Sequence, residues 1–185
     1  MARTLAGKRI AILATDGFEQ SELAEPRRAL EEAGAATDIV SLRAGTIRGW
    51  KDRNWGEAFN VDRIVGEANA DDYDALVLPG GVMNPDKLRV DRDALAFVRH
   101  FFERGRPVGA ICHGPWTLID AGVVQGRLMT SWPSLRQDLI NAGAHWTDEE
   151  VVTDGRLVTS RKPADLPAFN RKLVETIAES ATVHA

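Results

Sequence analysis

The chain has 185 residues, of which 44% are hydrophobic and 27% are charged, and its net charge is -4. This ordinary composition excludes collagen-like, low-complexity and disordered chains. The charge gives no indication of a nucleic-acid or anionic-membrane partner. A single cysteine, Cys112, excludes an intrachain disulfide and a cysteine-based zinc site. We expect one domain over residues 1–185, without a signal peptide or membrane span, in the cytoplasm.

Short apolar segments alternate with longer amphipathic segments in the first half of the chain. The continuous apolar run Arg9–Ala14 predicts a strand that is covered on both faces. A helix is expected over Ser21–Ala33, with a kink or a restart at Pro26. Thr37–Ser41 predicts a second strand. The glycine- and tryptophan-rich segment Arg43–Asp62 then predicts a small hairpin outside the main sheet.

The same alternation continues in the second half. Asp74–Leu78 and Pro107–Ile111 predict two buried strands, and Asp91–Arg104 between them predicts an amphipathic helix. The remaining predicted elements are a helix over Trp116–Ala121, a strand over Leu128–Ser131, a helix over Pro133–Asn141, a hairpin turning at Asp154-Gly155 and a helix over Pro163–Glu179. This order predicts an α/β fold with a mostly parallel sheet and helices on both faces.

The single thiol lies in the segment Ala110–Gly114, between a buried strand and the expected start of a helix. A sharp strand-to-helix elbow requires small residues on both sides of its tip, as in the G-x-S-x-G elbow of hydrolases. A thiol there faces the amino end of a helix, so we expect Cys112 to have a lowered pKa and a reactive thiolate. The alternative is a buried cysteine that packs as a small hydrophobic side chain.

Two further loops are expected near this thiol, because open parallel sheets bind their ligands at the carboxyl ends of the strands. One loop carries Glu19, a candidate hydrogen-bond donor or proton shuttle. The other carries Gly80 and Gly81, whose N–H groups are candidates for an oxyanion hole. Taken alone, Glu19 also fits an acid stabilised by a helix dipole, and the glycine pair also fits a plain turn.

His113 follows the thiol directly and is a candidate base, although adjacent side chains often point in different directions. No pair of histidines has the spacing of metal ligands, and we expect neither a metal nor a cofactor. Trp50 and Trp55 are candidates for an oligomer surface or for the wall of a site. Packing over the edge of the sheet is the alternative for these two side chains.

Several short segments, in order along almost the whole chain, together resemble the PfpI family of the ThiJ/PfpI superfamily. They are Phe18-Glu19 with Glu22-Leu23, Leu76–Gly81, Ala110–Pro115, Gly122-Val123 with Gly126-Arg127, Thr130-Ser131, Asn141–Ala144 and Ser160–Leu166. The resemblance implies a flavodoxin-like three-layer α/β sandwich with a nucleophile elbow. It also implies assembly as a homodimer or a larger homo-oligomer.

The resemblance assigns roles to individual residues. Cys112 is implied as the elbow nucleophile, Glu19 as the acid that hydrogen-bonds the thiol, and His113 as the neighbouring base. In the members that are intracellular proteases, a Glu after the glycine pair reaches the histidine from an adjacent subunit. Asp86 stands at the matching place here, but its side chain is one methylene shorter and its loop is one residue longer, which weakens the case for a triad. Related glutamine amidotransferases use a late His-x-Glu pair that this chain lacks, so glutaminase activity is disfavoured.

Three functions fit these residues. The first is a glutathione-independent glyoxalase or deglycase, in which Cys112 attacks a reactive aldehyde or a glycated group on a protein or peptide. The second is an intracellular cysteine peptidase that uses Cys112, His113 and Asp86. The third is a non-catalytic stress protein whose thiol responds to oxidants. Small aldehydes or glycated groups are the expected partners, with no nucleic-acid or membrane contact.

Overall fold

The computed structural model describes residues 4–182 of the chain. Its strands are β1 (Arg9–Leu13), β2 (Phe18–Glu19), β3 (Ala36–Ser41), β4 (Thr46–Lys51), β5 (Asn54–Asn60), β6 (Arg63–Ile64), β7 (Ala75–Leu78), β8 (Val108–Ile111), β9 (Leu128–Met129), β10 (His145–Trp146), β11 (Val151–Asp154) and β12 (Leu157–Ser160). Its α-helices are α1 (Gln20–Glu32), α2 (Met83–Leu88), α3 (Arg92–Glu103), α4 (Pro115–Ala121), α5 (Arg136–Asn141) and α6 (Leu166–Thr182).

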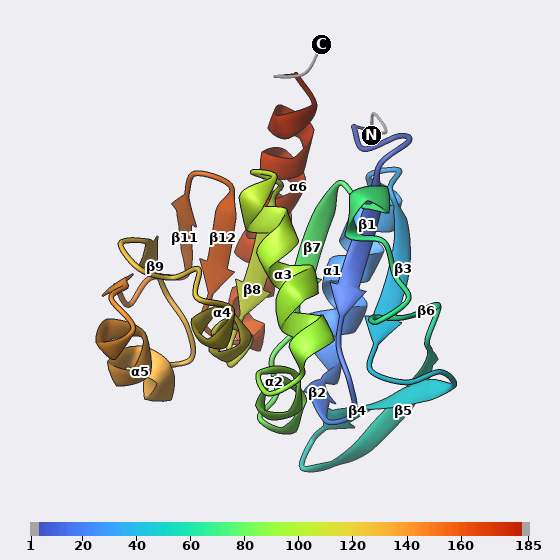
Figure 1. Cartoon of the computed structure of the whole chain (residues 1–185), viewed down its shortest axis with the longest axis horizontal. Helices are drawn as coiled ribbons and strands as arrows, with labels where there is room; N and C mark the ends of the chain where they lie inside the picture. Colours follow the sequence, from blue (N-terminus) through green and yellow to red (C-terminus); the bar gives the residue numbers. More distant parts are fainter. Residues whose placement is uncertain (1–3, 183–185) are drawn as a thin grey trace.

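The central sheet has seven strands in the order β11-β12-β8-β7-β1-β3-β6. Strands β12, β8, β7, β1, β3 and β6 run parallel, and only the edge strand β11 is antiparallel to its neighbour. The carboxyl ends of the parallel strands therefore meet along one edge, where the arrows point downward in Figure 1. This arrangement confirms the predicted α/β fold with a mostly parallel sheet.

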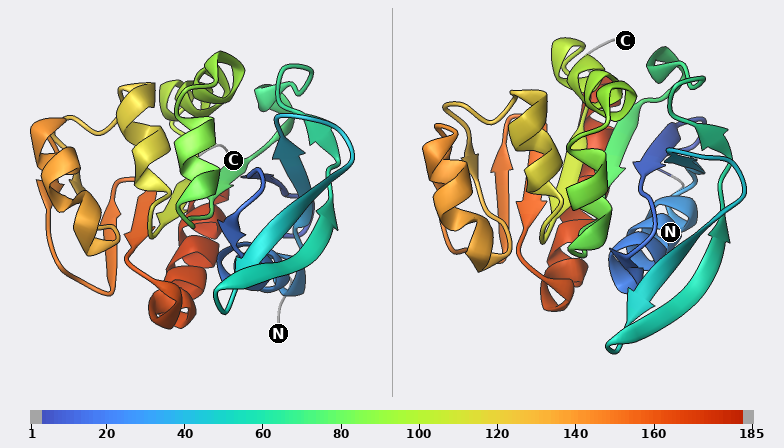
Figure 2. Two further views of the ribbon diagram at one scale, coloured as in Figure 1. Left: turned by 90° about the horizontal axis from the view of Figure 1, so that it is seen from below. Right: turned by 60° about the horizontal axis from the view of Figure 1, so that its bottom comes forward.

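Alternating side chains along each strand build two separate cores. In β1, Ile10 and Ile12 face the core that packs under α1 and α6, whereas Ala11 and Leu13 face the core under α2 to α5. All four side chains are fully buried, which explains why the strand is a continuous apolar run rather than an alternating one. The sheet lies between two helix layers, as the view from below shows (Figure 2).

The expected hairpin outside the main sheet is confirmed. Strands β4 and β5 pair in antiparallel fashion, and β4 also pairs with the short strand β2, which comes directly before α1. Asp52 and Arg53 form the two-residue turn, and both have positive φ angles, as the tightest hairpin turns require. The pairing brings this ribbon to the carboxyl edge of the sheet beside β2 (Figure 2).

Two local predictions differ from the structure. Helix α1 continues through Pro26 as one element, so the predicted restart does not occur. The segment after Gly81 forms the short helix α2, whereas the sequence predicts a loop there. Asn84 in α2 explains this difference, because its buried amide donates to the carbonyl oxygens of Pro79 and Gly80 and accepts from the Thr15 N–H. These long-range bonds hold the helix where local sequence gives little signal.

Candidate active site

The thiol lies at a sharp elbow between β8 and α4. Cys112 has a φ of 61°, in the left-handed region that a non-glycine residue adopts at a cost of about 1–3 kcal/mol. Its backbone is held from two sides, because its N–H donates to Ser160 O (3.0 Å) and its carbonyl accepts from Trp132 N–H (2.9 Å). A Cβ added to Gly114 would lie 2.6 Å from the carbonyl oxygen of Leu78, so the next turn needs glycine. The elbow predicted from small residues around the cysteine is therefore present.

The glycine pair after β7 approaches the elbow closely. A Cβ on Gly80 would lie 2.7 Å from the Cys112 Cβ and 2.9 Å from the His113 nitrogen. The Gly80 N–H donates to the carboxyl of Glu22 (2.8 Å), so it is not free for a substrate oxyanion. The N–H groups of Gly81 and His113 instead point at the sulfur and lower its pKa. Gly81 is thus the member of the pair whose N–H faces the thiol.

Glu22, and not Glu19, is the acid that contacts the thiol. The Glu22 side chain is fully buried in the first turn of α1, close enough to Cys112 that each group shifts the pKa of the other. Its Oε2 accepts from the Gly80 N–H, while its Oε1 has no hydrogen-bond partner among residues 4–182. The expectation that Glu19 hydrogen-bonds the sulfur is therefore wrong. Glu19 lies at the wall of the same pocket, and its carboxyl accepts a long hydrogen bond from the Ser21 hydroxyl (3.4 Å).

Burial controls the protonation of both carboxyls. It raises the pKa of Glu22 to about 8, and the nearby charge of Glu19 adds to this effect. It also raises the pKa of Glu19, whose side chain is only half-buried. At neutral pH the Glu22 carboxyl therefore holds its proton and can donate a hydrogen bond to the sulfur.

Burial also determines the direction of the pKa shift of the Cys112 thiol. Only 7% of the residue is exposed, and this burial raises the thiol pKa, as does an ionised Glu22. The lowered pKa expected from the sequence is thus wrong, since desolvation outweighs the N–H groups of Gly81 and His113. When Glu22 is protonated, it no longer carries the negative charge that disfavours a Cys112 thiolate, and its carboxyl can donate a hydrogen bond to the sulfur. Glu22 and Cys112 form a coupled pair in which the proton of one affects the other.

His113 is held directly against the thiol. Its Nδ1 lies 3.2 Å from Sγ, so the adjacent side chains do converge. The ring stacks on Trp132 (5.9 Å between centroids) and meets Trp116 edge-on (5.1 Å). Burial lowers the pKa of His113, which keeps the imidazole neutral and able to accept a proton at neutral pH.

Asp86 does not join the site within this chain. It lies on α2 with an exposed side chain, and its carboxyl has no hydrogen bond or ion pair to any of residues 4–182. The same part of the chain offers no carboxylate within ion-pair distance of the His113 ring. The structure therefore shows a thiol, an imidazole and a buried carboxyl, without a third group that orients the histidine.

The thiol opens into a pocket of about 290 Å³. The lining residues are Glu19, Glu22, Trp50, Gly81, Val82, Cys112, His113, Trp132 and Pro163. Trp50 thus belongs to the wall of the site, whereas Trp55 packs edge-on against it and is exposed. Trp132 and Pro163 were missed by sequence reasoning, because chain segments far from Cys112 bring them to the pocket.

Comparison with known proteins identifies the family of this chain. The profile of the DJ-1/PfpI family matches residues 8–176. The chain belongs to this family. It is 44% identical over 169 residues to a deglycase of Pyrococcus abyssi, which covers 91% of this chain and 99% of that protein. It is 43% identical over 168 residues to general stress protein 18 of Bacillus subtilis, with 90% and 95% covered.

A solved structure of the DJ-1/PfpI family shares the fold. DJ-1beta of Drosophila melanogaster superimposes with a TM-score of 0.83 at 26% identity, over 98% of this chain and 97% of that one. The match confirms the family assignment made from the sequence segments. Within residues 4–182 of this DJ-1/PfpI member, no helix has the length and apolar character needed to span a membrane.

Proposed function

We propose that this protein converts small α-oxoaldehydes into hydroxy acids without glutathione, and that it also removes such aldehydes from early glycation adducts. The observation that carries the proposal is the convergence of the Cys112 sulfur, the neutral His113 ring and the protonated Glu22 carboxyl on one small pocket. These groups supply a nucleophile, a base and an acid. The relatives named as a deglycase and a general stress protein support the same class of chemistry.

The first step is addition of the thiol to the aldehyde. His113 Nδ1 takes the thiol proton as the sulfur bonds to the aldehyde carbon of methylglyoxal, and Glu22 gives its proton to the carbonyl oxygen. The product is a hemithioacetal. Because burial raises the pKa of Cys112, the thiolate forms during this step and is not stored beforehand. The N–H of Gly81 stabilises the developing negative charge on sulfur.

The second step is an internal transfer of hydrogen. The ionised Glu22 takes the proton from the aldehyde carbon and returns it at the ketone carbon, while one hydroxyl proton moves between the two oxygens. This yields a lactoyl thioester of Cys112. Water hydrolyses the thioester to lactic acid, as Glu22 takes one proton from the water and His113 returns its proton to the leaving sulfur. Lactic acid then loses its proton to the solvent, and the thiol is free again. The net reaction adds one water to methylglyoxal, so no external oxidant or reductant is needed. The same thiol removes an aldehyde from an amine or thiol adduct, because early adducts form reversibly.

The pocket favours small neutral or cationic substrates. Its volume of about 290 Å³ is at the lower limit for small-molecule sites. It is lined by two carboxyls, Glu19 and Glu22, and by no lysine or arginine. The aromatic side chains of Trp50 and Trp132 complete the walls. A small oxoaldehyde, or such an aldehyde carried on a lysine or arginine side chain, fits a pocket of this size without a cationic residue better than an anion does.

The decisive experiment measures lactate formed from methylglyoxal in the absence of glutathione. Wild-type protein should form lactate, and Cys112→Ala should form none above the uncatalysed rate. The lactoyl thioester should appear by mass spectrometry on Cys112 in rapidly quenched samples. Lactate formation by Cys112→Ala would overturn the proposal, and so would a wild-type protein that alkylates at Cys112 but makes no lactate.

A cysteine peptidase is the second candidate, supported by the 3.2 Å contact between the sulfur and His113. Such enzymes orient the histidine with a third group, and no carboxylate of residues 4–182 does so here. The remaining version of this proposal takes Asp86 from a second subunit of a homo-oligomer. Cleavage of fluorogenic peptides by the purified oligomer, abolished by Asp86→Asn, would establish it, and absence of cleavage would exclude it.

The redox-responsive role has weaker physical support. Sensor thiols are exposed and have lowered pKa values, whereas Cys112 is buried and its pKa is raised. We expect mild peroxide to oxidise Cys112 slowly compared with an exposed thiol of ordinary pKa. Intact mass measured over time decides this, because rapid addition of oxygen at Cys112 would favour the redox role.

A further inference from the structure

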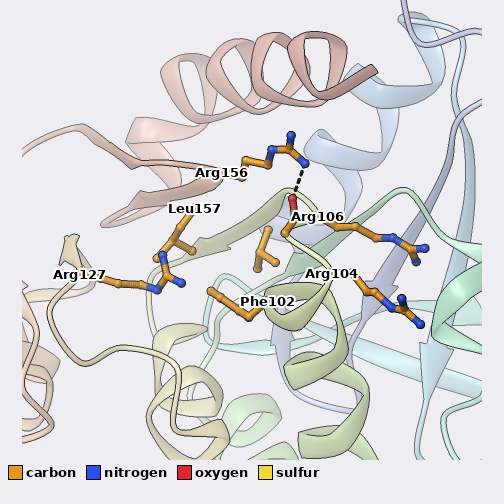
Figure 3. A pocket seen from close by; sticks show the side chains of 8 residues that line it. Phe102, Arg104, Arg106, Arg127, Arg156 and Leu157 are labelled. Carbon is orange, nitrogen blue, oxygen red and sulfur yellow. Dashed lines mark hydrogen bonds between the residues drawn. The ribbon is translucent and has the colours of Figure 1, made fainter. Parts of the chain in front are cut away.

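A second hollow lies at the opposite edge of the sheet, where β8 and β12 begin. It has a volume of about 360 Å³, and we call it the arginine pocket. Its apolar floor consists of Phe102, Val108 and Leu157, and its charged lining consists of Arg104, Arg106, Arg127 and Arg156. Figure 3 shows Arg127 extending toward Phe102 and Arg156 reaching across to the loop after α3. Strand β8 separates this pocket from the thiol, which follows the strand's other end.

The arginine pocket continues into an adjoining hollow of about 330 Å³. Arg104, Arg106 and Arg156 line both hollows, and Lys8 lines the second. Asp74, also in the second hollow, pairs with Lys8 at 3.0 Å. The three shared arginines therefore lie between two hollows of similar volume.

The positive charge of the arginine pocket is only partly compensated. Asp71 approaches Arg106 (3.2 Å) and Arg104 (3.7 Å) from outside the pocket. Arg127 and Arg156 have no carboxylate partner within residues 4–182. Each donates one hydrogen bond to a backbone carbonyl, Arg127 to Val123 (2.8 Å) and Arg156 to Gly105. A guanidinium has five N–H donors, so most of the donors of both side chains remain available.

Helix capping explains part of this arrangement but not all of it. Arginine side chains are favoured where helices end, because the last carbonyls carry partial negative charge. The bond from Arg156 to Gly105 fits that role after α3. Capping does not require Arg127 and Arg156 to line one concave site with an apolar floor. The Arg127 guanidinium lies 5.0 Å from the Phe102 ring centroid, and only its Nε has a hydrogen bond within residues 4–182.

We propose that the arginine pocket binds a small phosphomonoester with an apolar or aromatic body, such as a nucleoside monophosphate. The forked guanidinium of Arg127, or that of Arg156, matches the geometry and charge of a phosphate. The floor formed by Phe102, Val108 and Leu157 takes the body of the ligand. The volume lies within the range of small-molecule sites. The site is independent of the thiol chemistry, since none of its lining residues lines the Cys112 pocket.

The test is calorimetric titration of the full chain at low ionic strength with three compounds: AMP, inorganic phosphate and adenosine. AMP should bind, phosphate should bind more weakly, and adenosine should show no binding. Binding of AMP should weaken as sodium chloride is added, because salt screens the guanidinium charges. Absence of AMP binding would overturn the proposal. Phosphate binding as tight as that of AMP would overturn the role assigned to the apolar floor.

Variants then locate the site. The double variant Arg127→Gln/Arg156→Gln should weaken AMP binding at least tenfold. The matched control is Arg43→Gln. Arg43 is exposed, has no ion pair among residues 4–182 and does not line the arginine pocket. Lactate formation by the double variant should equal that of wild type, which shows that the variant is folded. Unchanged AMP binding by the double variant would overturn the proposal.

A second measurement keeps the proposal testable if the double variant does not fold. In wild-type protein, AMP should shift the side-chain Nε–H resonances of Arg127 and Arg156 in NMR spectra. Arg127→Lys/Arg156→Lys retains the charge but loses the fork, so its AMP affinity should fall several-fold. Shifts confined to arginines elsewhere, such as Arg48 and Arg161, would overturn the assignment.

Discussion

The two ends of strand β8 have opposite chemistry. Beyond its carboxyl end lies a buried thiol with an imidazole and a protonated carboxyl, packed so tightly that Gly80 has no room for a Cβ. At its amino end lies an open hollow with half-exposed arginines that donate to backbone carbonyls. In a parallel α/β fold, helices begin near the carboxyl ends of strands and end near the amino ends. Free N–H groups thus gather at one edge and free carbonyls at the other, which favours anions and cations respectively.

The largest expected effect is on catalysis, which belongs to the edge that carries the thiol. Glu22→Gln keeps an acceptor for the Gly80 N–H but removes the transferable proton, so lactate formation should fall about 100-fold or more. Glu19→Gln is the matched control in the same pocket and should stay within a few-fold of wild type. Steady-state lactate production measures both variants. Equal losses in the two variants would show that Glu22 has no special role.

The second expected effect, at the same edge, is a pH dependence of the free energy of unfolding that comes from Glu22. The pKa of Glu22 is raised from its ordinary value to about 8, so the native state binds this proton more tightly than the unfolded chain does. The favourable contribution is present in full below about pH 4.5 and is lost as the pH rises through 8. The free energy of unfolding of wild type, minus that of Glu22→Gln, should fall by up to about 1.4 kcal/mol per pH unit in this window. Urea unfolding of both proteins at pH 5 to 8 measures this difference. A difference that does not change with pH would contradict a raised pKa for the buried Glu22 carboxyl.

The third difference concerns the role of glycine at each edge. Gly80→Ala places a Cβ 2.5 Å from the Glu22 carboxyl, which should lower the free energy of unfolding by about 1–3 kcal/mol and reduce lactate formation. At the arginine edge, Gly155 has a φ of 57° and nothing within 4 Å of an added Cβ. Gly155→Ala should therefore cost only the backbone strain, about 1 kcal/mol, with activity intact. Equal activity loss in both variants would contradict the comparison.

The smallest expected effect is on the stability of the arginine edge. Arg127→Gln removes the contact with the Phe102 ring and should lower the free energy of unfolding by about 0.5–1 kcal/mol. Arg136→Gln is the matched control, because Arg136 lies 5.8 Å from the Trp146 ring centroid in a comparable contact. Urea unfolding compares the two variants. A loss above about 2 kcal/mol for Arg127→Gln would show that this side chain has a structural role, and that its N–H donors are not available to a ligand.

Local sequence signals were sufficient for the scaffold and for the position of the thiol. Continuous apolar runs predicted β1, β7 and β8, because strands buried on both faces leave no polar alternation. Small residues around Cys112 predicted the elbow, because backbone crowding there leaves no room for larger side chains. The family segments predicted the fold and the loops that surround the site. These features depend on residues close together in the chain.

Features that depend on burial were not predictable in the same way. Glu19 and Glu22 are both acids near the start of α1, and only the three-dimensional path shows that Glu22 is enclosed beside Gly80. The direction of the thiol pKa was wrong for the same reason, since desolvation cannot be inferred from spacing. Trp132 reaches His113 from a position nineteen residues further along the chain, and no local pattern places it there.

The left-handed backbone at Cys112 has a practical consequence for engineering. A design procedure that maximises folding free energy would replace Cys112 with glycine, because glycine adopts a φ of 61° without steric cost. The resulting scaffold would be more robust and would lack its only thiol. Any thermostabilised version of this protein should therefore hold position 112 fixed while the rest of the sequence is optimised.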